Sequence, residues 1–518
     1  MHAHRPTHSM AITDDDWQGP AATTAEPALG AADRSFFGHP KGLSVLFFTE
    51  MWERFSYYGM RGILILFMTA SVANGGMGFD TAKAGAVYGL YVSFVYLLAL
   101  PGGWVADRVV GQRNAVFIGG VVIALGHFSM AVPTAAMFYL GLVLIIFGTG
   151  LLKPNISTMV GELYPGDAGA RRDAGFSIFY MGINLGAFLA PLVVGYLGEK
   201  IDWHLGFGAA GVGMVAGLIW YKVGGRYLGD AGHFDGDVAE ARARGKNLLF
   251  ALVGLGAVLV AGLYMQSSGT INVTAARLAS LGGVVIAGLA LAYFAYVLIM
   301  GGLDLVEKKR VVAIFFLFAA SALFWSGFEQ AGSTLNLVAD RITDRFMFGW
   351  EIPASWFQSI NALFIITLAP VFAWLWVALA RKNLEPSSPL KFAFGLLLVG
   401  AGFAAMMLAT LAIATGDQIS PAWLVLTYFL HTTGELALSP VGLSTVTKLA
   451  PHRMVGQMMG VWFMSISLGN LIAGQVAGLY ESMELSTLFG TVATVSAAGG
   501  VLLLLFVGPI RKLMGGVH

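Results

Sequence analysis

The chain has 518 residues, of which 57% are hydrophobic and 11% are charged, and its formal net charge is +1. Soluble domains carry about 25% charged residues, so the composition excludes a soluble protein and predicts an all-α protein embedded in a lipid bilayer. The near-zero net charge argues against nucleic-acid binding, and the absence of cysteine excludes disulfides, thiolate metal sites and a cysteine nucleophile.

The chain divides into a polar tail and a series of apolar segments. Residues 1–40 lack the apolar core of a signal peptide, and we expect a disordered tail there. A membrane-spanning helix needs about 20 apolar residues, and fourteen segments are close to that length. They are 43–72, 82–106, 114–132, 135–161, 174–198, 205–225, 247–266, 277–301, 311–338, 354–380, 391–414, 421–447, 454–480 and 485–510.

The first of these spans carries a polar stripe. Its polar side chains recur at helical spacing on one side, at Glu50, Glu53, Arg54, Tyr57, Tyr58 and Arg61. Each charge costs about 2.5–3.5 kcal/mol at the centre of a membrane helix, so the stripe is expected to face a water-filled cavity or charged partners. The opposite side, with Phe48, Met51, Phe55 and Ile63, is compatible with lipid. The alternative is that Glu–Arg pairs within the helix only hold a bundle together.

A signature lies between spans two and three. The segment GGWVADRVVGQR, residues 102–113, resembles the loop signature of the major facilitator superfamily, with one extra residue before Gly111. Its charges can pair with neighbouring helix ends, which suits a gating latch better than a ligand site.

Span four contains Lys153 followed by Pro154. A buried ammonium without a partner is disfavoured, so Lys153 needs an anion, and Glu435 in span ten is a candidate. The proline bends its helix and frees a backbone carbonyl.

Amides and histidines also occur inside spans. Asn184 in span five and Asn361 in span eight are candidate ligands, although a buried asparagine also serves as a helix–helix hydrogen bond. His127 and His431 are candidate proton carriers, but a helix-contact role accounts for each of them better.

The hydrophilic stretch 226–247 and the two uncharged spans after it interrupt the series. We therefore expect an N-terminal six-helix bundle at 41–226, a cytoplasmic loop with a two-helix insertion at 227–308, and a C-terminal six-helix bundle at 309–514. Two six-helix halves with functional groups between them predict the major facilitator fold of a secondary transporter, with its site near the midplane.

The positions of Lys and Arg set the expected orientation. If the N-terminus is cytoplasmic, the clusters at 171–172, 242–246, 308–310 and 381–382 all fall in cytoplasmic loops. The positive-inside rule then places both termini in the cytoplasm.

Span seven is expected to be one helix with a polar face, formed by Trp325, Glu329, Ser333 and Asn336. At about 1.5 Å per residue, Glu329 and Arg61 lie at matching depth in the outer half of opposite bundles, so we predict that they pair when the cavity is closed to the outside. Lys153 and Glu435 form the second predicted gate pair, at the other end.

Several motifs together resemble the proton-dependent oligopeptide transporter family, prokaryotic branch, of the major facilitator superfamily. EMWER at 50–54 is similar to the family's ExxER motif, and FYMGINLG at 179–186 is similar to its FYxxINxG motif. The Lys-Pro of span four, the Glu of span seven and the Gly-Glu-Leu of span ten fit as well. The resemblance covers nearly all of the chain after residue 40.

The resemblance implies import of di- and tripeptides with protons by alternating access, across the bacterial cytoplasmic membrane, by a functional monomer without a cofactor. It implies proton coupling by Glu50, Glu53, Arg54 and Glu329. It implies a peptide pocket or gates at Tyr57, Tyr58, Arg61, Tyr96, Lys153, Asn184, Trp325, Glu329, Asn361, Glu435 and Trp462.

The chain departs from the family pattern at two places. Some members have two adjacent acids in span seven, whereas here Phe328 precedes Glu329 and leaves one acid. Some members use a histidine in span two, and residues 82–106 contain none, so that proton route is excluded.

A zwitterionic peptide needs an anion for its ammonium and a cation for its carboxylate. Glu435 with Asn184 and Asn361 suits the ammonium, and Lys153 or Arg54 suits the carboxylate. An importer of nitrate or another small anion is the alternative on the same scaffold, but a simple anion needs no acidic anchor. An enzyme is disfavoured because HExxH, GxSxG and a Cys nucleophile are all absent, and a channel would not need charge pairs between bundles.

Overall fold

The computed structural model describes residues 33–164, 169–234, 236–347, 349–412 and 417–516. Most of the predicted tail, residues 1–40, therefore lies outside the described residues. The first half of the chain contains α1 (Lys41–Thr69), α2 (Thr81–Leu97), α3 (Ala99–Val105), α4 (Gln112–Met130), α5 (Ala135–Glu162), α6 (Ala170–Ala190), α7 (Tyr196–Lys200) and α8 (Trp203–Gly224). Next come α9 (Val238–Ser267) and α10 (Ala275–Met300).

The second half contains α11 (Leu305–Phe328), α12 (Thr334–Arg341), α13 (Ser359–Arg381), α14 (Ser388–Leu411), α15 (Pro421–Leu449), α16 (Val455–Ala477) and α17 (Leu485–Met514). Strands β1 (Phe346–Met347) and β2 (Trp350–Glu351) form a short antiparallel hairpin, in which Phe346 pairs with Glu351.

The prediction of an all-α membrane protein is confirmed. Within the described residues, twelve helical segments are long and apolar enough to cross a membrane. Helices α1 and α15 occupy the two other predicted spans, and both carry ionisable side chains, such as Arg54 in α1 and Glu435 in α15. The two helices that fall short in hydropathy are thus helices that carry candidate site residues.

Several helices begin at a side-chain cap. A side-chain oxygen before the first turn accepts a backbone N–H that has no partner within the helix. Such caps precede α2, α5, α8, α9, α10, α11 and α15 at Asp80, Thr134, Asp202, Asp237, Thr274, Asp304 and Ser420. At these helices, a residue of the preceding loop therefore marks where the helix begins.

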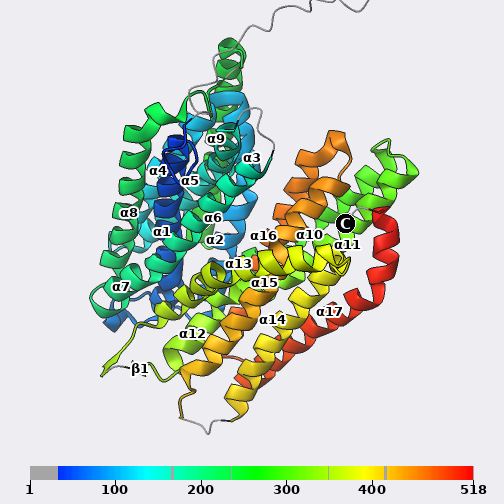
Figure 1. Cartoon of the computed structure of the whole chain (residues 1–518). Helices are drawn as coiled ribbons and strands as arrows, with labels where there is room; N and C mark the ends of the chain where they lie inside the picture. The colour runs from blue at the N-terminus through cyan, green and yellow to red at the C-terminus, as the bar shows by residue number, and fades with distance from the viewer. Residues whose placement is uncertain (1–32, 165–168, 235, 348, 413–416, 517–518) are drawn as a thin grey trace, which may run out of the picture.

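The helices form two groups that diverge at one end (Figure 1). Helix α1 packs against α6 and α8 in one group, and α14 packs against α15 and α17 in the other. Between the groups, α2 contacts α16 and α6 contacts α13. Helix α10 lies against α2 and α16, so it touches both groups.

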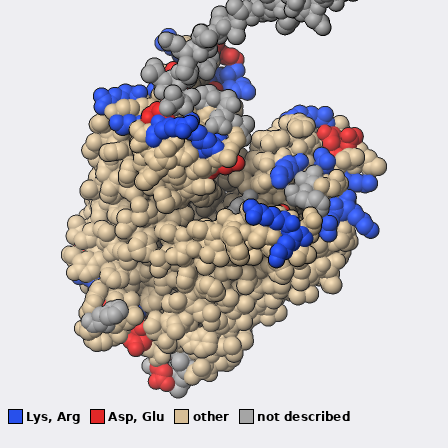
Figure 2. All heavy atoms as spheres, viewed as in Figure 1, with Lys and Arg blue, Asp and Glu red and all other residues tan. Residues whose placement is uncertain are grey.

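We name the two ends of the molecule by the space between the groups. At the open end, where α1 begins and α17 ends, the surface is hollowed between the groups, and Lys and Arg side chains gather around it (Figures 1 and 2). At the closed end, where the β1–β2 hairpin lies, the two groups meet. The molecule is therefore in a conformation with access from one end.

Two local expectations are wrong. Helix α1 is buried on nearly all sides, and Met51, Phe55 and Ile63, expected to suit lipid, are within 8% exposure because α6 and α8 cover them. Span seven is not one helix, because α11 ends at Phe328 and a 3-10 turn, η5 (Glu329–Gly332), separates it from α12.

Candidate functional site

At the closed end, Arg61 of α1 joins the two groups of helices. Its Nη2 lies 2.6 Å from Oε2 of Glu329, and its Nε donates a hydrogen bond of 2.7 Å to the hydroxyl of Tyr88 on α2. All three side chains are buried. A buried pair with a third partner resists separation, since removing one group strands the other charge.

Glu329 meets Arg61 from the break in span seven. Glu329 is the first residue of η5, so its backbone leaves the α-helical path there. At Gly332, the last residue of η5, a Cβ would lie 1.9 Å from the Tyr88 hydroxyl and 2.8 Å from Arg61 Nε. A residue without a side chain is therefore required where the turn meets this pair.

Two amide side chains meet the same carbonyl of α1. Asn336 donates from Nδ2 to the carbonyl oxygen of Gly62 at 2.7 Å, and Gln358 donates from Nε2 to the same oxygen at 3.2 Å. Ser359 donates to the carbonyl of Phe188 at 2.8 Å. These bonds all cross between the groups, so hydrogen bonds hold the closed end together as well as the Arg61–Glu329 ion pair.

Arg54 sits between two carboxylates of its own helix. Its Nε lies 2.9 Å from Oε1 of Glu50 and 2.5 Å from Oε2 of Glu53, and all three side chains are within 4% exposure. Two buried acids share one guanidinium, which leaves one negative charge without a dedicated partner. The Glu53 Oε1 atom is buried and has no hydrogen-bond partner among the described residues.

Lys153 and Glu435 lie on opposite groups and are not paired in this conformation. The Lys153 ammonium lies 4.0 Å from the centroid of the Tyr96 ring, a cation–π contact. Glu435 Oε2 accepts a hydrogen bond of 3.3 Å from Asn361, which also donates to Thr432 at 2.9 Å. The predicted second gate pair is therefore open here.

The remaining predicted residues are placed as follows. Asn184 is buried and donates to the carbonyl of Tyr180 on its own helix, not to Glu435. Tyr57 is buried and Tyr58 is partly exposed, with Arg61 over its ring. Trp325 and Trp462 are buried on α11 and α16. They line the second group of helices, where Trp462 packs against Phe392.

Both candidate histidines are buried helix residues. His431 packs against Phe403 and its Nε2 lies 3.2 Å from the Val399 carbonyl. Neither ring nitrogen of His127 has a hydrogen-bond partner among the described residues.

Sequence reasoning missed two residues of the closed end. Tyr88 lies in an apolar run and bonds Arg61, and Glu199 at the end of α7 contacts the opposite group through Ala354 and Ser355. The single signal for Glu199 is an acid two residues before the loop at 201–202, which is common at helix ends. Long-range pairing of this kind leaves no local pattern.

Charged side chains at the rim of the closed end also bridge the groups. Lys200 lies 3.0 Å from Glu351 of the hairpin, and Arg345, which lies 2.8 Å from the same carboxylate, is 4.0 Å from Glu199 of the other group. The hydrogen bond from Lys200 is the main cause that lowers the pKa of Glu351. These groups are partly exposed, and such pairs contribute about 0–1 kcal/mol each.

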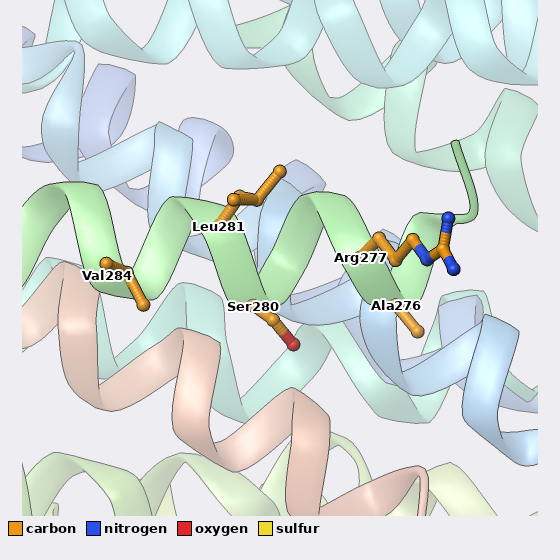
Figure 3. A pocket seen from close by; sticks show the side chains of 5 residues that line it. All are labelled: Ala276, Arg277, Ser280, Leu281 and Val284. Carbon is orange, nitrogen blue, oxygen red and sulfur yellow. The ribbon is translucent and has the colours of Figure 1, made fainter. Parts of the chain in front are cut away.

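A surface hollow elsewhere does not fit a charged substrate. It measures about 420 Å³ and is lined by five residues of α10, of which Arg277 at one end is the only charged one (Figure 3). All five lie on one helix, on the outside of the molecule. The opposed charges between the groups remain the candidate site.

Comparison with known proteins gives consistent matches over most of the chain. A family model described as the POT family matches residues 113–495. The peptide transporter YePEPT of Yersinia enterocolitica is 46% identical over 499 residues, which covers 94% of this chain and 97% of that protein. The di-/tripeptide transporter of Lactococcus lactis subsp. cremoris is 37% identical over 501 residues, 95% and 99% of the two chains.

Solved structures agree with these relatives. The crystal structure of a peptide transporter POT in complex with sulfate has a TM-score of 0.87 and 44% identity, and covers 94% of this chain and 99% of its own. A mutant of the same description, in complex with alafosfalin, has a TM-score of 0.85 at 44% identity, with 94% and 99% coverage.

Proposed function

This chain belongs to the POT family, and on that premise we propose that it imports di- and tripeptides together with protons by alternating access. It is a transporter and not an enzyme, and its fold is that of the family's structures. Relatives named as peptide and di-/tripeptide transporters support the substrate class. The nitrate alternative has no support among them.

The observation that carries the proposal is the separation of unlike charges across the interface between the bundles. Arg54 and Lys153 belong to the first bundle, and Glu435 belongs to the second. A zwitterionic peptide can bring its carboxylate to the cations and its ammonium to Glu435 and Asn361, so both ends are neutralised at once. A simple anion would leave the Glu435 carboxylate uncompensated.

We assign the pocket and gates on the same reasoning. The proposed peptide-contacting residues are Tyr57, Tyr58, Arg61, Tyr96, Lys153, Asn184, Trp325, Glu329, Asn361, Glu435 and Trp462. Asn184 donates from Nδ2 to the carbonyl of Tyr180 on its own helix, and its Oδ1 is the atom that would accept from the peptide ammonium. The aromatic members supply walls that tolerate varied side chains.

Proton coupling is proposed for Glu50, Glu53, Arg54 and Glu329. When a peptide carboxylate binds Arg54, it competes with a glutamate for the guanidinium. A buried glutamate that loses its cation is costly unless it takes up a proton. Peptide binding and protonation therefore favour each other, and the coupling needs only protons and no cofactor.

The open end is proposed to face the cytoplasm of a bacterial cell, across the cytoplasmic membrane. The Lys and Arg side chains around that end support this orientation (Figure 2), which places both termini in the cytoplasm. The described conformation is then inward-open, with the outer gate closed. We propose that one chain is sufficient for transport, because both bundles of the site come from the same chain.

The test is uptake of labelled dialanine into proteoliposomes under an imposed proton gradient. We expect concentrative uptake that di- and tripeptides compete and that free alanine and tetraalanine do not. Uptake that is indifferent to an inward proton gradient, or equally strong competition by free alanine, would contradict the proposal.

A further inference from the structure

Glu199 places its whole carboxylate against the opposite bundle. It lies on α7, near the closed end, and its side chain is 7% exposed. Its Oε2 accepts from the backbone N–H of Ala354 at 2.6 Å, and its Oε1 accepts from the backbone N–H of Ser355 at 2.9 Å and from the Ser355 hydroxyl at 2.5 Å. All three donors belong to the second bundle.

The three donors mark the start of a membrane helix. The 3-10 turn η6 (Ala354–Gln358) runs directly into α13, so the N–H groups of Ala354 and Ser355 are at its N-terminus and lack partners within the helix. The preceding residue, Pro353, makes no side-chain cap. A carboxylate is the favoured group at such an end, because it meets free N–H groups and the positive end of the helix dipole.

The local backbone of the first bundle is shaped to allow this contact. A π-helical turn, η3 (Pro191–Gly195), precedes α7, and Trp356 donates to the carbonyl of Leu192 within it at 3.1 Å. A Cβ on Gly195 would lie 2.0 Å from the Ser355 hydroxyl oxygen. The absence of a side chain at Gly195 therefore lets Ser355 reach Glu199.

Other charges near Glu199 differ in exposure and role. Arg345 of the second bundle lies 4.0 Å from its Oε2 and also contacts Asp340 and Glu351. Lys200, the next residue, pairs with Glu351 at the exposed rim. Glu199 is the buried member of this group and binds backbone donors.

We propose that Glu199 is a positioning residue of the transport cycle, which caps the N-terminus of η6–α13 across the bundle interface only while the outer side is closed. This rests on the proposed function, since the cap acts through Asn361, six residues after Ser355, and through the Arg61–Glu329 gate beside it. When the bundles separate at this end, the carboxylate and the two N–H groups must find water instead. The cap thus stabilises the outward-closed state and holds Asn361 in register with Glu435.

The chain contains no cysteine, so two introduced cysteines can carry spin labels without background. Ile201 and Phe346 are exposed at the closed end, one on each bundle. The distance distribution between labels on Ile201→Cys and Phe346→Cys reports opening in full-length protein in nanodiscs, without peptide or gradient. It is therefore independent of whether the protein imports peptides.

The test compares Glu199→Gln with a matched control, Glu484→Gln. Glu484 lies at the same end but contacts Ser486 in its own bundle. We expect Glu199→Gln to raise the ratio of open to closed molecules about tenfold, as expected for loss of a hydrogen-bonded charge, and Glu484→Gln to change it less than twofold. Ser355→Ala removes one donor and should shift the ratio in the same direction by a smaller factor.

Transport measurements separate positioning from general structural damage. Glu199→Gln should raise KM for dialanine in counterflow more than it lowers the maximal rate, because Asn361 is displaced while the chain stays folded. The proposal is wrong if the label distances of Glu199→Gln and Ser355→Ala both match the parent. It is also wrong if the two effects add fully in the double mutant, since contacting groups must couple.

Discussion

Arg61 and Glu329 come from different bundles, and their side-chain atoms meet 2.6 Å apart in a buried setting. The Tyr88 hydroxyl completes the contact by accepting from Arg61 Nε. The pair lies at the closed end, where Asn336 and Gln358 also donate to the carbonyl of Gly62. The proposed outer gate therefore consists of an ion pair, supported by amide side chains that donate to a backbone carbonyl.

Removing Arg61 should open this gate. Arg61→Ala leaves the Glu329 charge buried without its partner, which costs about 3–5 kcal/mol in the closed state, whereas water can solvate Glu329 in the outward-open state. We expect spin labels on Asn74→Cys and Phe346→Cys to report a longer distance, and transport to slow. Asn74 and Phe346 are both exposed, so they suit these labels.

A double-mutant cycle tests whether the two residues act as a pair. Arg61→Ala with Glu329→Ala removes both charges, so the shift should be smaller than the sum of the single shifts. Strictly additive shifts would show that the residues act separately, and Arg61 would then be assigned to holding peptide.

Gly332→Ala should disturb the same gate by steric means alone. The added Cβ would fall 1.9 Å from the Tyr88 hydroxyl, so either η5 or Tyr88 must move. We expect a shift towards the outward-open state, partly reversed by Tyr88→Phe, which removes the clashing oxygen. A parent-like distance distribution in Gly332→Ala would show that η5 can relax without loosening the gate.

Glu53→Gln should abolish gradient-driven uptake of dialanine, and Glu50→Gln should reduce or abolish it. The amide cannot take up and release a proton, while it keeps the size of the side chain beside Arg54. Peptide counterflow, which needs no net proton movement, should persist in Glu53→Gln and serves as the control for folding. Unchanged gradient-driven uptake in both single mutants would place the proton site elsewhere, with Glu329 the next candidate.

The rim pair of Lys200 and Glu351 should give closure a modest acid sensitivity. Its hydrogen bond lowers the pKa of Glu351 below the ordinary value of 4.5 in the closed state. Closure therefore gains from the ionised carboxylate above about pH 4.5, and the gain is lost as the pH falls through the lowered pKa.

Because Glu351 is half exposed, screening limits the effect. We expect the ratio of open to closed molecules, read from the Ile201–Phe346 label distances, to change by less than about fivefold between pH 6 and pH 3.5. Glu351→Gln should remove that part of the pH dependence, and high salt should weaken it in the parent. If Glu351→Gln leaves the acid-induced change in this ratio unaltered, the change arises from other groups.

Hydropathy and helical spacing were sufficient to predict the spans, the polar stripe of α1 and the matching depth of Arg61 and Glu329. They could not predict the break at Glu329, because it accompanies a close approach between Gly332 and Tyr88, which lie far apart in the sequence. They also could not show that α1 is central. An apolar side chain buried by α6 has the same composition as one that faces lipid.

The cap at Glu199 escaped prediction for a related reason. A carboxylate at the end of a span is ordinary at a water interface, and its role appears only when Ala354 and Ser355 are brought beside it. The placement of Asn361 beside Glu435 was anticipated from the needs of a zwitterion, whereas Asn184 bonds Tyr180 instead. The sequence thus predicted which polar side chains the site contains better than it predicted which residues they bind.

Lys153 and Glu435 should form the inner gate in the opposite conformation. In this structure Lys153 makes a cation–π contact with the Tyr96 ring, and Glu435 accepts a hydrogen bond from Asn361. Both are weak interactions that an ion pair between the two residues can replace. Lys153→Ala should therefore keep the cytoplasmic side open, with labels on Ala170→Cys and Asn383→Cys reporting the long distance even at saturating dialanine. The charge swap Lys153→Glu with Glu435→Lys restores opposite charges across the interface and should recover closure, although not peptide uptake, because the ammonium and carboxylate sites are exchanged. If the cytoplasmic side stays open in the charge-swap variant but closes normally in each single variant, the two residues do not form the inner gate. Lys153 then serves only to bind the peptide carboxylate.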